Sequence, residues 1–479
     1  MKINNKIILS GLITTLTTLL NGCTVGPDYH RPSIPVPAVY KEADMKHWTK
    51  AVPADLFHRG KWWEVFHQPK LNELEDKLII SNQTIITAEA QYRQARALVD
   101  EARASYFPTL SASASTIRQE VSSLSSSSSS SSASSVSSIT NTANQVGLNA
   151  SWEPDIWGSV RRTVEANQAA AESSFAQLAA TRLSAEASLA QYYFELRGVD
   201  SDQQLLSKTV RDDKKILQLT KNLFKNGVDS MVNIVQARAQ LENAQALLIN
   251  LGINRGQYEH AIAVLIGVAP ADLSLKYHPF FGQPPTIPPQ LPSQLLERRP
   301  DIAAAERTMA QANAQIGVAI AAYFPTLTFT PTGSIQSINN WFNPPLYNWA
   351  VGPMLAETLF DGGLRSATTA AARANYDATV AQYRQTVLSA FQNVEDNLVA
   401  LRVLKSQAIV QDKAAADAAL TLTLTINQFK AGTAAYTNVV TAQINAYNAE
   451  KSAVDVTTLR MTFTVGLVKA LGGGWIATV

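Results

Sequence analysis

The only cysteine of the chain stands where a covalent modification is expected. Residues 1–22 have a positively charged start and an apolar stretch, and they end in Leu20-Asn21-Gly22 directly before Cys23. This pattern is typical of a bacterial lipoprotein signal peptide, after whose removal Cys23 becomes the acylated N-terminus. Acyl chains on Cys23 would anchor the chain in membrane lipid, with about 0.8 kcal/mol from each buried methylene. An ordinary secretory signal followed by an incidental cysteine is the alternative interpretation.

Other residues that could do chemistry do not form a recognisable site. His47, His58 and His67 lie in a proline-rich segment at spacings of 11 and 9, so we interpret them as surface histidines rather than metal ligands. The sequence contains no His-Glu-x-x-His, no Gly-x-Ser-x-Gly and no phosphate-binding glycine loop. A net charge of +2 provides no basic surface for nucleic acid. We therefore predict no enzymatic activity, no metal site, no nucleic-acid partner, and no cofactor except the covalent lipid on Cys23.

An internal repeat organises the elements of the chain. The stretch Tyr106-Phe107-Pro108-Thr109-Leu110 recurs 217 positions later as Tyr323-Phe324-Pro325-Thr326-Leu327. Further pairs match at offsets of 204 or 205: Gly158-Ser159-Val160-Arg161 with Gly362-Gly363-Leu364-Arg365, Phe224-Lys225-Asn226-Gly227 with Phe429-Lys430-Ala431-Gly432, and Ile266-Gly267 with Leu471-Gly472. The first copy therefore contains about a dozen extra residues, which the Ser-rich tract 122–138 accounts for. Such self-similarity indicates a duplicated architecture.

The duplication and the proline content divide the chain into six segments. They are a signal peptide 1–22, a lipid-anchored Pro-rich N-terminal arm 23–70, a first repeat 71–268, a Pro-rich connector 269–300, a second repeat 301–472 and a C-terminal tail 473–479. The first repeat is expected to begin with a helix from about Leu71 to Ser105. The Ser-rich tract 122–138 cannot bury much apolar surface, so we expect a loop there between two strands.

Alternating apolar and polar residues follow each Tyr-Phe-Pro motif and predict two strands per repeat. The runs are about 9–11 residues long, with Trp341 and Tyr347 near their ends, which is typical of transmembrane β-strands. A soluble hairpin would give the same alternation. No segment after residue 22 approaches 18 consecutive apolar residues, so a membrane span in the mature chain would have to be β-structure. Four strands cannot close a barrel alone, which predicts a dimer or a larger assembly.

A long helical pattern follows each strand pair, over about 159–223 and 364–428. A helix of this length extends about 100 Å. Gly227 and Gly432 end the two helices, and each returning helix has a heptad pattern, which predicts a coiled-coil hairpin in each repeat. The heptad positions are Ile234, Ala237, Leu241, Ala244, Leu248, Leu251, Ile262 and Leu265, and in the second copy Val439, Ala442, Ala446, Ala449, Ala453, Val456, Leu467 and Ala470.

Taken together, these features resemble the outer-membrane efflux proteins of the TolC family, and most closely the OprM- and NodT-like lipoprotein branch. The resemblance covers essentially the whole mature chain and is carried by four motifs: Cys23-Thr24-Val25-Gly26-Pro27-Asp28-Tyr29, Trp152-Glu153-Pro154-Asp155-Ile156-Trp157-Gly158, Glu297-Arg298-Arg299-Pro300-Asp301-Ile302 and Leu359-Phe360-Asp361-Gly362-Gly363. It implies an α+β membrane protein that forms a homotrimer. Four transmembrane strands per chain would share a 12-strand β-barrel in the bacterial outer membrane, joined to a long α-helical coiled-coil barrel in the periplasm.

The function that the resemblance implies is passive conduction. The chain would be the outer-membrane channel of a tripartite efflux system and would receive exported compounds from an inner-membrane pump of the RND type and a periplasmic adaptor protein. An outer-membrane exit duct for type I protein secretion is one alternative hypothesis. A non-conducting structural coiled-coil lipoprotein is another. The transported substrate is not determined by the sequence, because the pump and the adaptor select it.

The resemblance also implies that the two helical turns form the periplasmic tip and the adaptor-docking surface. The residues concerned are Phe224, Gly227, Val228 and Asn233 in the first copy and Phe429, Gly432, Thr433 and Asn438 in the second. Thr437, Asn438 and Thr441 are the candidate aperture residues. Family members commonly have acidic residues where this chain has Asn233, Asn438 and Thr441, so we do not expect a charged ring to close the aperture. An ordinary helix end without a partner is the alternative for each turn.

Overall fold

The computed structural model describes residues 24–37, 40–42, 60–124, 136–280, 282–285, 287, 298–340, 342 and 344–473. The predicted signal peptide, Cys23, His47, His58, the middle of the Ser-rich tract, residues 281, 286 and 288–297 of the Pro-rich connector 269–300, Trp341 and the tail from residue 474 lie outside these residues.

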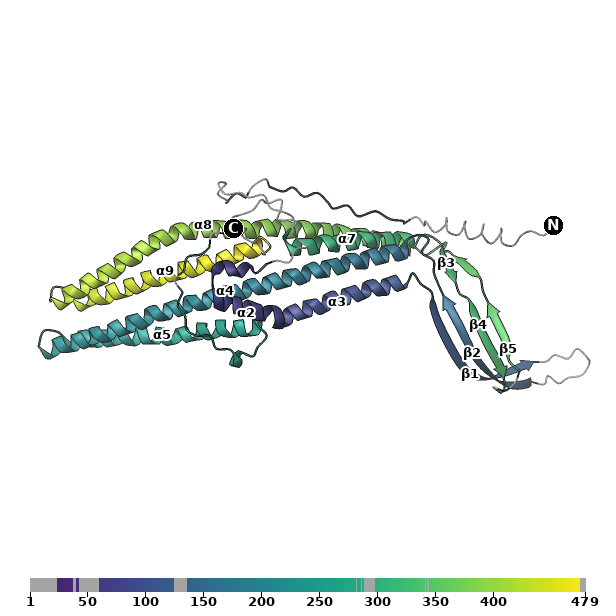
Figure 1. Ribbon diagram of the computed structural model, residues 1–479, viewed down its shortest axis with the longest axis horizontal. Coiled ribbons are helices and arrows are strands. Elements are labelled where there is room, and N and C mark those ends of the chain that lie inside the picture. Colours follow the sequence, from purple (N-terminus) through teal and green to yellow (C-terminus); the bar gives the residue numbers. More distant parts are fainter. Residues whose placement is uncertain are drawn as a thin grey trace, which may run out of the picture. The chain divides into compact units, whose positions relative to one another are not determined.

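The order of helices and strands repeats within the chain (Figure 1). The α-helices α3 and α7 have 22 residues each, α4 and α8 have 67 each, and α5 and α9 have 35 each, which is the pattern that a duplication predicts. The bounds are η2 Trp62–Phe66, α2 Pro69–Ser81, α3 Gln83–Ala104, β1 Thr109–Leu124, β2 Val136–Ser151, α4 Ser159–Lys225, α5 Met231–Leu265, η3 Pro270–Asp272, α7 Pro300–Ala321, β3 Thr326–Phe329, β4 Thr332–Ile338, β5 Leu346–Ala350, β6 Pro353–Ala356, α8 Leu364–Lys430 and α9 Tyr436–Ala470.

The chain divides into two compact units. The strand unit comprises Met1–Pro32, Arg93–Glu172 and Arg307–Ala381, and the helical unit comprises Ser33–Tyr92, Ser173–Glu306 and Gln382–Val479. Among the described residues, no helix combines the length and the hydropathy needed to cross a bilayer.

In the strand unit, the chain makes the four predicted strand passes. A four-stranded antiparallel sheet has the order β1-β2-β4-β5, and β3 pairs with β6 in a second sheet. The third pass is interrupted between β3 and β4 at Pro331, which has no backbone N–H to donate to a ladder. The fourth pass is interrupted between β5 and β6 at Val351 and Gly352. The sequence therefore predicted the number of passes correctly but not the interruptions.

The prediction of 9–11 residues per strand is wrong for the first pair. Strands β1 and β2 have 16 residues each and pair continuously from Thr109 opposite Ser151 to Leu124 opposite Val136. The expected lengths relied on apolar side chains, whereas the ladder is built from backbone groups that polar residues supply equally well. Both strands thus extend into the tract 122–138 for which we expected a loop.

The single helix expected from Leu71 to Ser105 is two helices, α2 and α3. The break is at Asn82, whose Oδ1 accepts hydrogen bonds from the backbone N–H groups of Thr84 and Ile85, both at 3.0 Å. Its Nδ2 also donates to the carbonyl oxygen of Leu265 at 2.7 Å. Asparagine is among the preferred N-cap residues because its side chain satisfies the first free N–H groups of a helix. The capping interaction thus starts a new helix inside a continuous apolar pattern.

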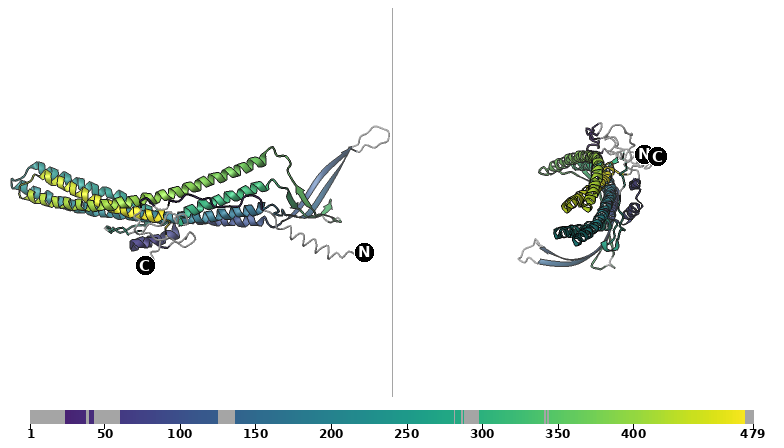
Figure 2. Two further views of the ribbon diagram at one scale, coloured as in Figure 1. Left: turned by 90° about the horizontal axis from the view of Figure 1, so that it is seen from above. Right: turned by 90° about the vertical axis from the view of Figure 1, so that its left-hand side faces the viewer.

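The heptad prediction for the returning helices is confirmed. In α5 and α9, every predicted heptad position is buried or half-buried, and Ile234, Ala237, Val439 and Ala442 are among the buried ones. Near the turns, Ala237 packs in one apolar cluster with Ile216, Phe429, Tyr436 and Val439, so both hairpins contribute to the same core. The views of Figure 2 agree with this contact, because the α8–α9 hairpin lies beside the α4–α5 hairpin.

A second apolar cluster of the helical unit surrounds α2 and includes a buried acid. The cluster contains Trp62, Trp63, Phe66, Leu71, Leu74, Leu78, Leu189, Tyr193, Phe194, Ile262, Met461 and Val465. Glu75 on α2 is fully buried, and neither carboxylate oxygen has a hydrogen-bond partner among the described residues. Burial, reinforced by the nearby Glu186 and Asp76, raises the pKa of Glu75 well above its usual value. The folded chain thus keeps this carboxyl protonated over a pH range in which the unfolded chain ionises it.

We expect Glu75→Gln to stabilise the protein at pH 8 and to have little effect at pH 4. Below the unfolded-state pKa both states are protonated, whereas at higher pH only the unfolded wild-type chain gains the favourable ionisation. The free energy of unfolding of the wild type therefore falls as the pH rises, and the Gln variant avoids this loss. Thermal unfolding of the purified protein in detergent at both pH values measures the difference.

Glu73→Gln is the matched control on the same helix. Glu73 is exposed and accepts from Lys70 and Lys77, both at 2.8 Å, which lowers the pKa of Glu73 to about 2. Its loss should lower the unfolding temperature slightly at pH 8, which is the opposite sign. If Glu75→Gln also lowered the unfolding temperature at pH 8, the inferred protonated state of Glu75 would be wrong.

Candidate docking site at the two helical turns

The turn between α4 and α5 ends the first long helix through a left-handed glycine. Gly227 has φ 73°, its N–H donates to the carbonyl oxygen of Phe224 at 3.0 Å, and the N–H of Val228 donates to that of Leu223 at 2.9 Å. A glycine takes this conformation at little cost, and the two bonds satisfy carbonyl groups at the helix end. Phe224 and Val228 are 43% and 69% exposed, so the turn presents apolar side chains to its surroundings.

The turn between α8 and α9 has the same backbone but a different surface. Gly432 has φ 74°, and its N–H donates to the carbonyl oxygen of Phe429 at 3.0 Å, while the N–H of Thr433 donates to that of Gln428 at 2.9 Å. However, Phe429 is only 7% exposed and packs on Tyr436, with ring centroids 5.5 Å apart. We expected both Phe224 and Phe429 on the docking surface, but Phe429 instead belongs to the core between the hairpins.

The two asparagines also differ in exposure, but in the opposite sense to the phenylalanines. Asn233 is half-buried and donates through Nδ2 to Oδ1 of Asp229, which also accepts from the N–H of Ser230 at 2.8 Å. Asn438 is exposed, as are Thr437 and Thr441.

Asp229 is a functional candidate that the sequence analysis did not identify. It stands just before the N-cap Ser230 of α5, where carboxylates are favoured. The first turn therefore carries a carboxylate although position 233 is neutral.

Buried polar groups connect the two hairpins behind the turns. Asp213 on α4 is buried and accepts a hydrogen bond from Nε2 of Gln443 on α9. The second oxygen of Asp213 and Oε1 of Gln443 have no hydrogen-bond partner among the described residues. Burial raises the pKa of Asp213 to about 6. It also raises the pKa of Asp202 to about 6, although an oxygen of Asp202 lies 3.7 Å from Nζ of Lys451 on α9. Neither aspartate was a candidate in the sequence, because its partner is on the other repeat.

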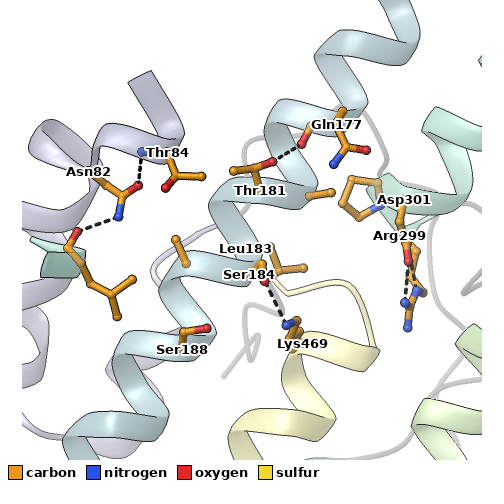
Figure 3. Close-up of a pocket in the computed structure, with 14 residues that line it drawn as sticks. Asn82, Thr84, Gln177, Thr181, Leu183, Ser184, Ser188, Arg299, Asp301 and Lys469 are labelled. Carbon is orange, nitrogen blue, oxygen red and sulfur yellow. Dashed lines mark hydrogen bonds and ion pairs between the residues drawn. The ribbon is translucent and has the colours of Figure 1, made fainter. Parts of the chain in front are cut away.

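The helical unit also contains a cavity of about 480 Å³, which is lined by both polar and apolar side chains (Figure 3). Its lining residues come from the α2–α3 connection, α4, the start of α7 and α9; those labelled are Asn82, Thr84, Gln177, Thr181, Leu183, Ser184, Ser188, Arg299, Asp301 and Lys469. The cations there are engaged within the chain: Arg299 binds Asp301 and the carbonyl oxygen of Ala470, and Lys469 donates to Oγ of Ser184 at 3.0 Å. Across the described residues, no three His, Cys, Asp or Glu side chains form a metal-binding group.

In the strand unit, the junction after β2 brings the two repeated Tyr-Phe-Pro motifs together. Nε1 of Trp152 donates to the carbonyl oxygen of Tyr106 at 3.0 Å, and Nε1 of Trp157 donates to that of Pro325 at 2.8 Å. The Trp157 ring also stacks on Phe324, with centroids 4.7 Å apart. One short motif therefore contacts the same sequence element of both repeats.

Comparisons with known proteins agree with this architecture. A protein-family model described as "Outer membrane efflux protein" matches residues 74–268 and 291–473, which is well over half of the chain. The "Antibiotic efflux pump outer membrane protein ArpC" of Pseudomonas putida is 29% identical over 98% of this chain and 96% of that protein. The "Probable outer membrane lipoprotein SilC" of Salmonella typhimurium is 24% identical over 97% of this chain and 98% of that protein.

Among solved structures, the MtrE outer-membrane channel of Neisseria gonorrhoeae, captured in its open state, superposes with a TM-score of 0.79. It is 28% identical in sequence, and the match covers 94% of this chain and 98% of MtrE. The repeated strand pairs and helical hairpins, the family model and the full-length relatives lead to one conclusion: the chain belongs to the outer membrane efflux proteins, the TolC family of outer-membrane channels.

Proposed function

We propose that this chain is the outer-membrane channel of a tripartite efflux system, anchored by a lipid on Cys23. It passively conducts compounds delivered by an inner-membrane RND-type pump through a periplasmic adaptor. The observation that carries the proposal is the equal pairing, in both repeats, of two strand passes with a 67-residue helix and a 35-residue returning helix. A 67-residue helix is about 100 Å long, which is far more than the thickness of a bilayer. We infer no catalytic role.

The strands support a trimer in this proposal. In the described sheet, β1 and β5 are edge strands, each paired on one side only. One face of this sheet also exposes apolar side chains, which suits contact with lipid: Leu110, Val146, Leu148, Ile335, Tyr347 and Trp349. In lipid the unpaired backbone groups of the edges need partners, and four passes are too few to close. Three chains supply 12 passes and pair every β1 edge with a β5 edge.

Conduction is the direct test of the channel function. Purified protein in a planar lipid bilayer should give stepwise ion currents that are absent from detergent-only controls. A non-conducting structural lipoprotein would give none, and that outcome would overturn the proposal. Deleting the gene for this chain should also make the host bacterium more sensitive to small compounds that the system exports. If the deletion instead stopped only the secretion of a protein, a type I secretion duct would be favoured.

Disulfide cross-linking tests the trimer at its edges. Cysteines placed singly along residues 111–117 of β1, combined with Asn348→Cys on β5, should give cross-linked dimers and trimers but nothing larger, because three chains close the ring. Cys23 is the only native cysteine and would be acylated, so the background is low. Each single-cysteine variant serves as the control. A ladder beyond three chains, or no cross-link at any register, would contradict the trimer.

Large side chains introduced at the two turns test whether the turns dock the adaptor. We expect Gly227→Trp and Gly432→Trp to abolish export and adaptor co-purification, because a large side chain blocks the tip. The controls Gly227→Ala and Gly432→Ala impose the same backbone strain, about 1–2 kcal/mol, without the bulk and should retain most export. Trimer yield must be equal in all variants. Normal export by both Trp variants would show that these turns do not dock the adaptor.

A further inference from the structure

The first described residues of the chain occupy a site of their own in the strand unit. Thr24–Asp28 contact the start of α4 and the second half of α7. The N–H of Val25 donates to the carbonyl oxygen of Trp157 at 3.1 Å, and Nδ2 of Asn313 donates to that of Pro27 at 3.0 Å. We define the N-terminal docking site as Trp157, Gly158, Arg162, Asn313 and Gly317.

Arg162 is the centre of this site. Its side chain is only 4% exposed, and it donates to the carbonyl oxygens of Val25 and Gly26 at 3.2 and 3.3 Å and to Oδ1 of Asp28 at 2.8 Å. Its remaining acceptor is Glu165, at 2.7 Å. Three of the four acceptors therefore belong to the N-terminal segment. A buried guanidinium without these acceptors would be strongly destabilising, so the site is built for an occupant with this backbone.

Glycines on both sides allow the close approach. A Cβ on Gly26, which has φ 96°, would lie 2.5 Å from Cα of Gly317. A Cβ on Gly317 would lie 2.8 Å from Cγ of Arg162, and a Cβ on Gly158 would lie 2.9 Å from Cγ2 of Thr24. Distances below 3.0 Å are not tolerated between such atoms, so the segment, the helix α7 and the helix α4 meet at three positions without room for a side chain.

We propose that the N-terminal docking site fixes the lipid-bearing residue next to the start of α4 and so couples the membrane anchor to both repeats. This inference rests on the proposed acylation of Cys23. Thr24 is already in contact with Gly158, so a single Cα–Cα step of about 3.8 Å separates the anchor from the folded protein. Because α4 belongs to the first repeat and α7 to the second, the docked segment holds both.

The alternative to docking is a loose tether. Further along the arm, the N–H groups of Lys41 and Glu42 donate to the Glu395 carboxylate at 2.7 and 3.1 Å. Without the docking site, the five residues Thr24–Asp28 would become a flexible link that spans about 11–13 Å. Docking therefore replaces a flexible linker by a fixed point, which restricts how the anchored protein can move relative to the membrane.

Gly317→Ala tests the docking contacts without introducing a positive-φ strain. The new methyl group should displace Arg162 and release the segment, so that deuterium uptake of the peptide 24–30 becomes about tenfold faster by hydrogen-exchange mass spectrometry. Gly252→Ala in α5 is the matched control, because nothing lies within 4 Å of its Cβ. Arg162→Lys, which keeps a cation but loses the planar fork, is the second variant and should accelerate exchange as well. Unchanged uptake in both variants would overturn the docking site.

A spacer insertion tests whether the docking site positions the lipid anchor or only stabilises the folded chain. Six Gly and Ser residues inserted between Cys23 and Thr24 leave every docking contact intact but free the lipid. If the site serves to fix the anchor, the insertion and Gly317→Ala should both reduce the yield of assembled oligomer in the outer membrane several-fold relative to Gly252→Ala. If the insertion left the yield of assembled oligomer unchanged, the proposed coupling between the docking site and the membrane anchor would be wrong. Mass spectrometry of the mature N-terminal peptide identifies an unmodified Cys23, which would refute the lipid anchor itself independently of the exchange data.

Discussion

Before each of the two 67-residue helices, an aspartate accepts hydrogen bonds from backbone N–H groups at the start of the helix or directly before it. Asp155 accepts from the N–H groups of Val160 and Arg161 at 3.0 and 2.9 Å, and Asp361 from those of Gly363 and Arg365 at 2.9 and 3.1 Å. The first N–H groups of a helix have no partner within it, and a negative charge is favoured there. Each junction therefore supplies acceptors for N–H groups at the start of a 67-residue helix.

The repeats show how equal sequences acquire unequal roles. Gly227 and Gly432 have nearly the same φ, and the following hydrogen bonds are the same. Phe224 is nevertheless exposed and Phe429 buried, because only the latter meets Tyr436 and the neighbouring hairpin. The backbone conformation and hydrogen bonds are therefore the same at the two turns, whereas the side chains that the turns expose are not. Any partner that contacts both turns meets two different surfaces.

Carboxylates in apolar surroundings give the helical unit its pH sensitivity. Glu75 lies inside the cluster around α2, and Asp213 lies between the hairpins opposite Gln443. Burial raises the pKa of each, so ionisation at higher pH disfavours the folded arrangement. In the strand unit, the buried Arg162 is compensated by the carboxylates of Asp28 and Glu165 and by two carbonyl groups of an extended segment. A buried charge is tolerated in each case only to the extent that neighbouring groups neutralise or solvate it.

Short-range patterns in the sequence determined the duplication, the helix ends at Gly227 and Gly432, the heptad positions and the four strand passes, because each depends on periodicity or on one residue's backbone preference. Even local signals were missed at Asn82 and Pro331, where a cap and a missing N–H outweighed the apolar pattern. Only the tertiary structure decided the burial of Phe429, the pairing of Asp213 with Gln443 and the docking of Thr24–Asp28 on Arg162, Asn313 and Gly317. These contacts join residues more than 130 positions apart or in different repeats, and no local pattern records which distant group will satisfy a buried polar atom.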